Sequence, residues 1–297
     1  MKSVFHLDLA PLGSVISAAI ITITISLTAC SKVEDFLRPK DPPRLEGKRI
    51  PILTHNRSLT ADKNLNSQPI LLPAPTPNTS WPQAGGYANH AMHHIEVNDI
   101  LKPAWSVDIG TGSDDEERLN AQPVVAAGMV FTMDARTQVR AFNEASGQLI
   151  WSAELEPDDD DDSHIGGGLA FEDGHLFVTT GFAEVIALEA KTGKVIWRQN
   201  LTAPMRTAPT VRNGRLFAVT LNNQIFALNV KDGSIIWRHR GLPEVASVLG
   251  GASPAVGKGV AIVAYTSGEL IAFKVENGRI LWQDVLVTNS RPGTLSG

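Results

Sequence analysis

The chain has 297 residues, of which 43% are apolar, and its formal net charge is −5. This composition can build a large hydrophobic core and excludes a fibrous or wholly disordered protein. The mildly acidic charge argues against nucleic acid as the main partner. Because the chain contains one cysteine, it can form no internal disulfide.

Residues 12–29 form an uncharged apolar run that ends in Leu27-Thr28-Ala29-Cys30. The run is long enough for a membrane-spanning helix, and an uncleaved anchor with an incidental cysteine is the alternative. The tetrapeptide resembles the bacterial lipobox, so we expect residues 1–29 to be a signal peptide and Cys30 to carry the lipid. Ser31 follows, and by this resemblance the sorting signal implies the inner leaflet of the outer membrane, with acyl chains such as palmitate as the membrane anchor.

Residues 30–80 contain many prolines separated by polar residues, with no hydrophobic period. This pattern predicts a tether between the lipid and the folded domain, partly in the polyproline II conformation. The folded part is expected to begin at Trp81-Pro82-Gln83-Ala84-Gly85-Gly86. His90, His93 and His94 follow at a helical spacing that could hold a metal ion, but no carboxylate or cysteine pattern supports a metal site.

The rest of the chain contains four copies of one sequence repeat. Gap-free copies end at Trp151, Trp197, Trp237 and Trp282, which are 46, 40 and 45 residues apart. Four positions before each tryptophan stands a glycine: Gly147, Gly193, Gly233 and Gly278. Ten positions before stands an alanine: Ala141, Ala187, Ala227 and Ala272. A fixed period of this size is typical of a repeat architecture.

Each copy predicts four short strands. In the third copy, Asn213-Gly214 separates two strands within residues 210–219, residues 224–228 form a third, and Asp232-Gly233 leads to a fourth at residues 235–238. Four antiparallel strands in this length correspond to one β-propeller blade. We therefore expect an all-β propeller with about four complete blades in residues 81–297, and the repeat alanines and tryptophans packed between blades. Trp105 lies one period before Trp151 and matches the last strand of an incomplete preceding repeat.

Other motifs carry no clear chemistry. The acidic runs at residues 114–117 and 158–162 lack the alternation and glycine of a calcium loop, so solvated loops are expected. Gly110-Thr111-Gly112 and Gly166-Gly167-Gly168 lack the lysine and helix of a phosphate-binding loop. We find no catalytic motif, and we expect no catalytic residue, no metal and no cofactor.

The segment from Ala187 to Trp197 resembles the PQQ-like repeat of quinoprotein propellers, and the resemblance covers about residues 105–297. It implies the fold and the docking of each tryptophan between blades, and it is not specific for cofactor binding. A lipoprotein with this propeller resembles the BamB family, of alphaproteobacterial type, in 81–86, 249–254 and 267–270. Members are non-catalytic subunits of the β-barrel assembly machinery. The resemblance implies binding to BamA, to other assembly subunits and to unfolded outer-membrane proteins, at the periplasmic face of the outer membrane.

The family docks through loops on one rim, and the matching loop here is residues 241–253, with apolar Leu242, Val245, Val248 and Leu249. Four exposed apolar residues favour a partner surface, although packing on the neighbouring blade is the alternative. Because the family has eight blades, the resemblance implies missing C-terminal blades and a chain that self-associates or is marginally stable alone. Two other functions stay open: a PQQ-dependent dehydrogenase, and a propeller lipoprotein with another envelope partner.

Overall fold

The computed structural model describes residues 69, 71–114, 118–157, 165–243 and 251–286. The chain divides into two compact units, Met1–Pro69 and Ile70–Gly297. The described residues belong almost entirely to the second unit, which contains all the strands. The expected signal peptide, Cys30, Val245, Val248 and Leu249 lie outside the described residues.

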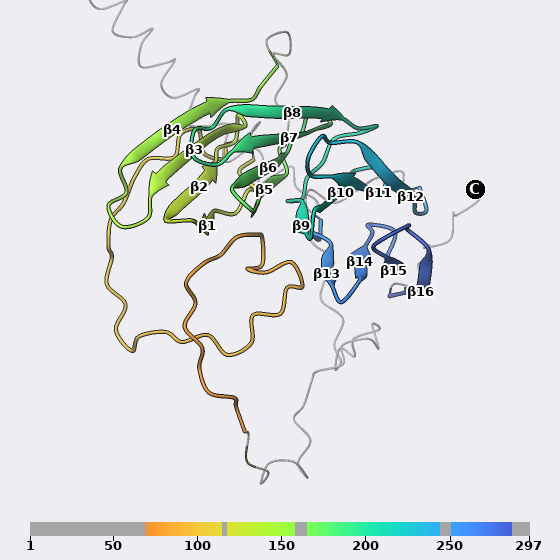
Figure 1. The fold of residues 1–297 in the computed structure, drawn as a ribbon, viewed down its shortest axis with the longest axis horizontal. Helices are drawn as coiled ribbons and strands as arrows, with labels where there is room; N and C mark the ends of the chain where they lie inside the picture. Colours follow the sequence, from red (N-terminus) through yellow and green to blue (C-terminus); the bar gives the residue numbers. More distant parts are fainter. Residues whose placement is uncertain (1–68, 70, 115–117, 158–164, 244–250, 287–297) are drawn as a thin grey trace, which may run out of the picture. The chain divides into compact units, whose positions relative to one another are not determined.

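Sixteen strands are present among the described residues, and none of these residues forms a helix. They form four antiparallel sheets in chain order, here called blades 1 to 4 (Figure 1). Blade 1 consists of β1 (Val124–Ala126), β2 (Met129–Met133), β3 (Gln138–Asn143) and β4 (Leu149–Glu154). Blade 2 consists of β5 (Gly168–Glu172), β6 (His175–Thr179), β7 (Glu184–Glu189) and β8 (Val195–Asn200).

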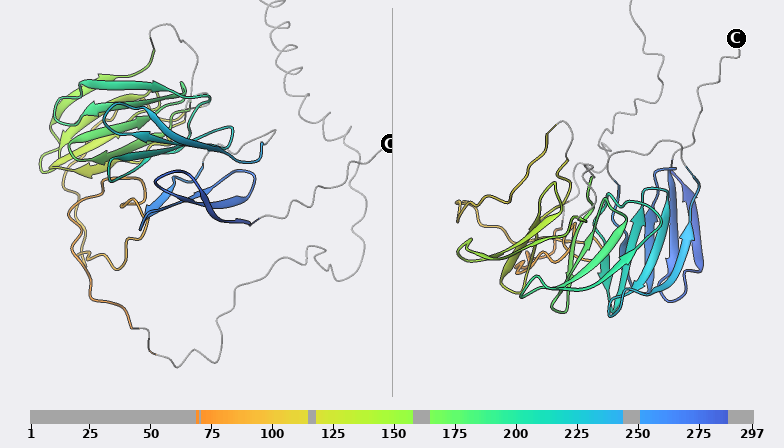
Figure 2. Two further views of the ribbon diagram at one scale, coloured as in Figure 1. Left: turned by 45° about the vertical axis from the view of Figure 1, so that its right-hand side comes forward. Right: turned by 90° about the horizontal axis from the view of Figure 1, so that it is seen from above.

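Blade 3 consists of β9 (Thr210–Arg212), β10 (Arg215–Thr220), β11 (Gln224–Asn229) and β12 (Ile235–Arg240). Blade 4 consists of β13 (Ala255–Gly257), β14 (Val260–Ala264), β15 (Glu269–Lys274) and β16 (Ile280–Val285). The two views of Figure 2 show the four sheets side by side, and the first strands of successive blades contact one another. The predicted all-β fold with four-stranded propeller blades is confirmed.

The hairpin turns form where the sequence predicts them. Asn213 and Gly214 have φ values of 50° and 75°, the pair of positive φ angles that a two-residue hairpin turn requires. Asparagine and glycine adopt this conformation most readily, since other side chains collide with the backbone there. The turn therefore sets the register of β9 on β10, which pairs Thr210 with Phe217.

The hydrophobic core lies between the blades rather than within one of them. Each of three buried clusters joins residues of two successive blades. Along β10, Leu216 and Ala218 pack towards blade 2, whereas Phe217 and Val219 pack towards blade 4. This alternation follows from the two-residue period of a strand, and it explains why both faces of an inner strand are apolar.

The repeat tryptophans dock each blade on the next. The indole Nε1 of Trp151 donates to the Ala190 carbonyl at 2.9 Å, and its ring covers Gly193 so closely that an added Cβ would lie 2.5 Å from Trp151 Cε3. Trp197 makes the same two contacts with blade 3, and Trp237 makes them with blade 4. In each case the carbonyl lies seven positions, and the glycine four positions, before the tryptophan of the blade that is contacted. The glycine is required because its φ is positive and because the ring leaves no room for a side chain.

Two tryptophans stand at the ends of this series. Trp105 makes the same contacts with blade 1, since its Nε1 donates to the Glu144 carbonyl and its ring covers Gly147. Residues around Trp105 form no strand, in contrast to the expectation, because the described residues provide no neighbouring strand for them to pair with. Trp282 is 44% exposed, whereas Trp151 and Trp237 are 9% and 8% exposed.

Residues 81–88, here called the crossing segment, connect all four blades. The segment forms hydrogen bonds with the first strand of each blade. The contacted residue is equivalent in all four blades, since it always lies twenty-six positions before the blade's tryptophan: Val125, Phe171, Val211 and Val256. Trp81 exchanges two backbone hydrogen bonds with Val125, and the Pro82 and Ala88 carbonyls accept from Phe171 and Val256. The segment thus ties together blades that are distant in sequence.

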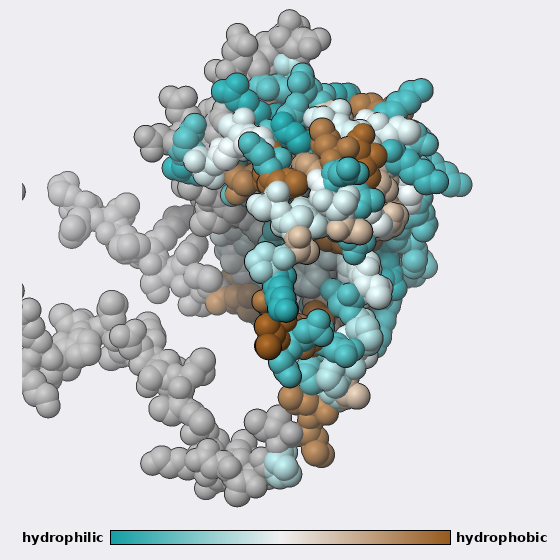
Figure 3. Space-filling model, turned by 90° about the vertical axis from the view of Figure 1, so that its left-hand side faces the viewer, coloured by the Kyte–Doolittle hydropathy of each residue, from teal (hydrophilic) through white to brown (hydrophobic). Residues whose placement is uncertain are grey.

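Exposed apolar residues occur mainly on the outermost strands. Two aliphatic residues precede the tryptophan in each blade and are exposed: Leu149, Ile150, Val195, Ile196, Ile235, Ile236, Ile280 and Leu281. Figure 3, which shows the side on which blade 1 lies, has apolar patches separated by hydrophilic side chains. Among the described residues there is no helix of the length and hydropathy that a membrane crossing needs.

Candidate functional site: the cleft between blades 3 and 4

One end of the sheets carries both the turn between the second and third strands of each blade and the connection to the next blade. This arrangement results from the up-and-down order of the strands. We call this end the loop rim. The predicted docking loop, residues 241–253, is the connection between β12 and β13, and its described residues 241–243 and 251–253 belong to this end.

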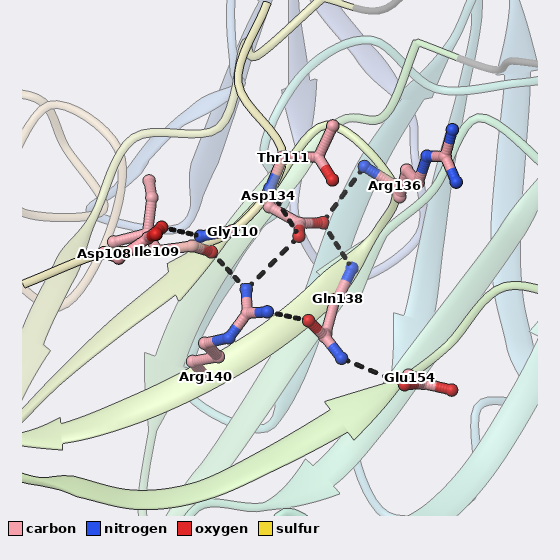
Figure 4. A network of polar contacts seen from close by, with 9 residues as sticks. All are labelled: Asp108, Ile109, Gly110, Thr111, Asp134, Arg136, Gln138, Arg140 and Glu154. Atoms are coloured by element: carbon pink, nitrogen blue, oxygen red, sulfur yellow. Dashed lines mark hydrogen bonds and ion pairs between the residues drawn. The ribbon is translucent and has the colours of Figure 1, made fainter.

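In blade 1 the loop rim is a closed polar network (Figure 4). The buried carboxylate of Asp134 accepts backbone N–H groups from Arg136, Gln138 and Thr111 at 2.9–3.1 Å. The guanidinium of Arg140 lies 3.2 Å from the carboxylate and also donates to the Ile109 carbonyl and to the Gln138 side chain. The buried charge is therefore paired and hydrogen-bonded, as stability requires, and it offers no open site.

The position of Asp134, seventeen residues before the blade tryptophan, differs in blade 4. Blades 2 and 3 have Thr180 and Thr220 there, whose hydroxyls bond to the backbone of their own turns. Blade 4 has Tyr265 at this position. Its ring is instead buried against Gly241, where an added Cβ would lie 3.0 Å from Tyr265 Cδ2.

Asn223 fastens the start of the predicted docking loop to both blades. This residue is 2% exposed and has a φ of 56°. Its side-chain amide donates to the Leu242 carbonyl at 2.8 Å, and its side-chain carbonyl accepts the hydroxyl of Thr266 at 2.9 Å and the Thr266 N–H at 3.3 Å. Its backbone carbonyl accepts the Gly241 N–H at 2.7 Å.

Leu242 is held through its backbone while its side chain faces solvent. Its N–H donates to Glu269 Oε2 at 2.7 Å, and its carbonyl is bound by Asn223. The residue is nevertheless 58% exposed. For Leu242, therefore, the alternative that the loop residues pack on the neighbouring blade does not apply. An apolar side chain on a fixed backbone loses little conformational entropy when a partner covers it.

A small cleft with a cavity volume of about 30 Å³ lies between blades 3 and 4, beside the connection from β12 to β13. The turns of both blades line it, together with Arg206, Thr207, Gly251 and Ala252 from the connections. Thr207, one of the lining residues, has a buried hydroxyl without a hydrogen-bond partner among the described residues, whereas the Tyr265 hydroxyl lies close enough to the backbone of Ile225 for a hydrogen bond. Buried polar atoms without a partner are uncommon in folded proteins and call for a physical explanation.

Tyr265, which lines the cleft, and His239, on the outermost strand of blade 3, have pKa values shifted from the ordinary ones. Burial, with a smaller contribution from Glu269, raises the pKa of Tyr265 against the weaker effect of a hydrogen bond from the backbone of Ile225, so the hydroxyl stays protonated. Burial lowers the pKa of His239, whose ring lies 4.9 Å from the ring of Phe273, although Glu269 acts in the opposite direction. Both shifts favour the neutral forms of Tyr265 and His239 at physiological pH.

The histidines considered as metal ligands are not on a helix. His90 and His93 have positive φ values, and His94 Nδ1 lies 2.7 Å from the Pro73 carbonyl. No group of three potential metal ligands occurs among the described residues. Of the predicted docking residues, Leu242 lies beside the cleft, whereas Val245, Val248 and Leu249 lie outside the described residues.

Three residues of the cleft, Asn223, Thr207 and Tyr265, were not identified from the sequence. Tyr265 could have been found from the repeat itself, because three blades place a short polar residue at its position and one places an aromatic ring. No comparable signal marks Thr207, whose unpartnered hydroxyl results from the way two blades meet.

Comparisons with known proteins agree with the repeat. The sequence model of a family described as "Outer membrane protein assembly factor BamB" matches residues 135–296, which is more than half of the chain. The structure of BamB from Moraxella catarrhalis is similar with a TM-score of 0.50 and 20% identity, over 59% of this chain and 51% of that one. No curated protein has significant sequence similarity to the chain.

Solved dehydrogenases share the fold to a similar degree. Quinohemoprotein alcohol dehydrogenase ADHIIG from Pseudomonas putida HK5 gives a TM-score of 0.56 at 18% identity, over 69% of this chain and 40% of that one. The quinohemoprotein alcohol dehydrogenase from Comamonas testosteroni gives 0.55 at 18% identity, over 69% and 41%. At these identities the likeness shows the fold alone, and the chain spans about half or less of each of these proteins.

Proposed function

The chain belongs to the family of the outer membrane protein assembly factor BamB, and from this membership we propose that it is a non-catalytic scaffold subunit of the β-barrel assembly machinery. In this role it binds the periplasmic domains of the barrel-inserting subunit BamA and aids the insertion of unfolded outer-membrane proteins. Family membership implies association with the cell envelope. The partner, the lipid anchor and the absence of catalysis are parts of the proposal.

The exposed side chain of Leu242 on its fixed backbone is the observation that carries the proposal. It lies in the loop that the resemblance matches to the family's docking rim, and its carbonyl and N–H are both bound by buried or half-buried groups. A preorganised apolar residue of this kind suits the centre of a protein–protein contact.

The test replaces Leu242 by glutamate and measures binding to the purified periplasmic domains of BamA by calorimetry. An unpaired carboxylate buried in an apolar contact costs several kcal/mol, so we expect binding about 100-fold weaker or more. The control is Leu149→Glu, since Leu149 is 56% exposed but lies on β4, away from the loop rim. If both variants bind as the wild type does, the loop assignment is wrong. If the wild type does not bind BamA, the proposed function falls.

The lipid anchor is tested separately. Cys30 follows Leu27-Thr28-Ala29, so we propose that the chain is cleaved before Cys30 and diacylated there. Cys30→Ser should release the protein from membranes or leave it unprocessed. An intact mass of the mature protein that still includes residues 1–29 would contradict this proposal.

An enzyme is the second candidate, because the dehydrogenase structures share this fold as well as BamB does. A quinone-dependent dehydrogenase would reduce a redox dye when PQQ and an alcohol are added. Dye reduction above the protein-free rate would favour the enzyme, and its absence together with BamA binding would favour the scaffold. Co-purification with another envelope protein, without BamA, would point to a different partner.

A further inference from the structure

The outermost strands of blades 2 and 3 carry a positive charge that the other two blades do not share. In each blade the last turn and the outermost strand span the residues from seven positions before the tryptophan to three after it. In blades 2 and 3, residues 190–200 and 230–240 contain six lysines and arginines and one carboxylate, a net charge of +5. In blades 1 and 4, residues 144–154 and 275–285 contain one arginine and four carboxylates, a net charge of −3. The repeat does not require this concentration of cations, and the chain as a whole has a charge of −5.

Most of these cations are available to an external anion. Arg198 is paired with Glu184 at 2.7 Å. The other five cations are exposed, and none of them forms an ion pair with another described residue: Lys191, Lys194, Lys231, Arg238 and Arg240. The nearby carboxylates of Glu189 and Asp232 each accept a hydroxyl of their own turn. The five cations therefore outnumber the carboxylates around them.

Apolar side chains lie between the cations on the same surface. Four aliphatic residues of β8 and β12 are 37–45% exposed: Val195, Ile196, Ile235 and Ile236. The indole of Trp197 donates to the Val230 carbonyl at 2.9 Å, so β8 lies against the turn that holds Lys231. Both strands are the last of their sheets, and their outer edges are unpaired (Figure 1). We call the five unpaired cations and the four aliphatic residues the basic edge.

This combination suits the interface of a lipid bilayer. Aliphatic side chains enter the boundary between headgroups and acyl chains, while lysine and arginine reach the phosphates with their flexible stems. Each cation near an anionic leaflet adds to the attraction, so five act together. The basic edge is the outer margin of two strands and their turns, and none of its residues lines the cleft between blades 3 and 4. An extended layer of headgroups fits such a margin better than a partner that needs a groove.

We propose that the basic edge lies on a lipid bilayer and binds the phosphate groups of anionic headgroups. This contact goes beyond the proposed scaffold function and does not depend on BamA. The lipid proposed at Cys30 would hold the protein at such a surface and raise the effective concentration of headgroups. The contact then fixes which side of the blades faces the bilayer.

The test measures how fast exposed lysines are acetylated by a water-soluble N-hydroxysuccinimide ester, read by peptide mass spectrometry. It uses the full chain with vesicles of phosphatidylcholine alone or of phosphatidylcholine mixed with phosphatidylglycerol. We expect the anionic vesicles alone to slow acetylation of Lys191, Lys194 and Lys231 several-fold, and high salt to remove part of this protection. Lys258, which is exposed in the hairpin between β13 and β14, is the internal control and should react equally in both.

Charge variants test the same surface. Lys194→Gln combined with Arg238→Gln removes two cations from the basic edge, and the protection of the remaining lysines by anionic vesicles should fall about tenfold or more. The matched control combines Arg212→Gln with Lys258→Gln, which removes the same charge from two exposed positions at the inner hairpins of blades 3 and 4. The control should keep the protection. All four positions are exposed, so circular dichroism should show an unchanged fold in both variants.

The outcomes separate this inference from the proposed function. Equal acetylation with neutral and anionic vesicles, or an equal loss of protection in both double variants, overturns the membrane contact. If the purified periplasmic domains of BamA protect the three lysines without lipid and the vesicles do not, the basic edge is a protein interface, so the inference is wrong while the proposed function stands. If anionic vesicles protect the lysines but BamA does not bind, the inference stands and the proposed function falls.

Discussion

The side-chain amide of Gln83 pairs with the backbone of Val211, 128 residues later in the chain. Nε2 donates to the Val211 carbonyl at 2.7 Å, and the Val211 N–H donates to Oε1 at 2.9 Å. The glutamine thus completes the edge of β9 as the backbone of another strand would. Both partners are buried, so the pair satisfies two backbone groups that would otherwise lack hydrogen bonds.

Gln83→Ala should destabilise the protein substantially. The Val211 N–H and carbonyl lose their partners in a buried place, and each such loss costs about 1–3 kcal/mol. We expect the free energy of unfolding to fall by about 2–4 kcal/mol in urea denaturation. Gln199→Ala is the control, because its amide donates to the adjacent Asn200 carbonyl at the surface. Equal stability of the two variants would contradict the bridging role of Gln83.

Gly193→Ala and Gly174→Ala separate backbone strain from tryptophan docking. Both glycines have nearly the same φ, 73° and 79°. An added Cβ meets no atom within 4 Å at Gly174 but would lie 2.5 Å from Trp151 at Gly193. We expect a loss of about 1 kcal/mol at Gly174 from strain alone and of more than about 3 kcal/mol at Gly193. Thermal denaturation measures the difference, and similar losses would show that the ring can move aside.

Asn223→Gly should loosen the connection between blades 3 and 4. Glycine keeps the positive φ but removes the side-chain bonds to Leu242 and Thr266. We expect about 1–3 kcal/mol lower stability and faster amide exchange at Leu242. Ala183 occupies the same turn position in blade 2 with a φ of 63°, so Ala183→Gly relieves strain and should be neutral or stabilising. A loss of equal size in both variants would rule out the role given to the asparagine.

Stability should fall as the pH decreases through about 6.5. Burial lowers the pKa of His239 and of His90 in the folded protein, so the unfolded chain binds more protons as the pH falls through about 6.5. The contribution of these histidines is complete above that pH, decreases below it and levels off once the folded pKa is passed. His239→Gln should reduce the change in unfolding free energy across this range. An unchanged pH dependence in the variant would show that His239 does not titrate differently on folding.

The blade structure could be predicted from the sequence because its causes are local and repeated. The glycine of the first hairpin, Gly214 in blade 3, and the glycine beneath the tryptophan ring, Gly193 in blade 2, each recur at the same spacing in every blade. The pairing of Gln83 with Val211 could not be predicted, since a polar residue in a proline- and glycine-containing stretch gives no sign of a partner 128 residues away.

The candidate site was predicted only at its exposed edge. Leu242 was identified as an apolar residue in a loop, which the composition of the loop reveals. The cleft behind it depends on where Tyr265 of blade 4 meets the connection from blade 3, and that depends on the packing of two sheets. Whether a hydroxyl has a partner is a property of this packing and not of the local sequence.

Insertions and deletions are best tolerated at one end of this molecule. Each blade is contacted by the crossing segment and by the tryptophan of the preceding repeat. All of these contacts fall within the last twenty-seven residues of a repeat, which begin at the residue that contacts the crossing segment and end at the tryptophan. The differences among the 46-, 40- and 45-residue steps therefore fall between a tryptophan and the next repeat, on the loop rim. A longer or shorter connection there changes the surface that is available to a partner, while each tryptophan ring still packs on its glycine. The opposite end has no such freedom, because it carries the two-residue turns between first and second strands and the turns whose glycines lie beneath the tryptophan rings.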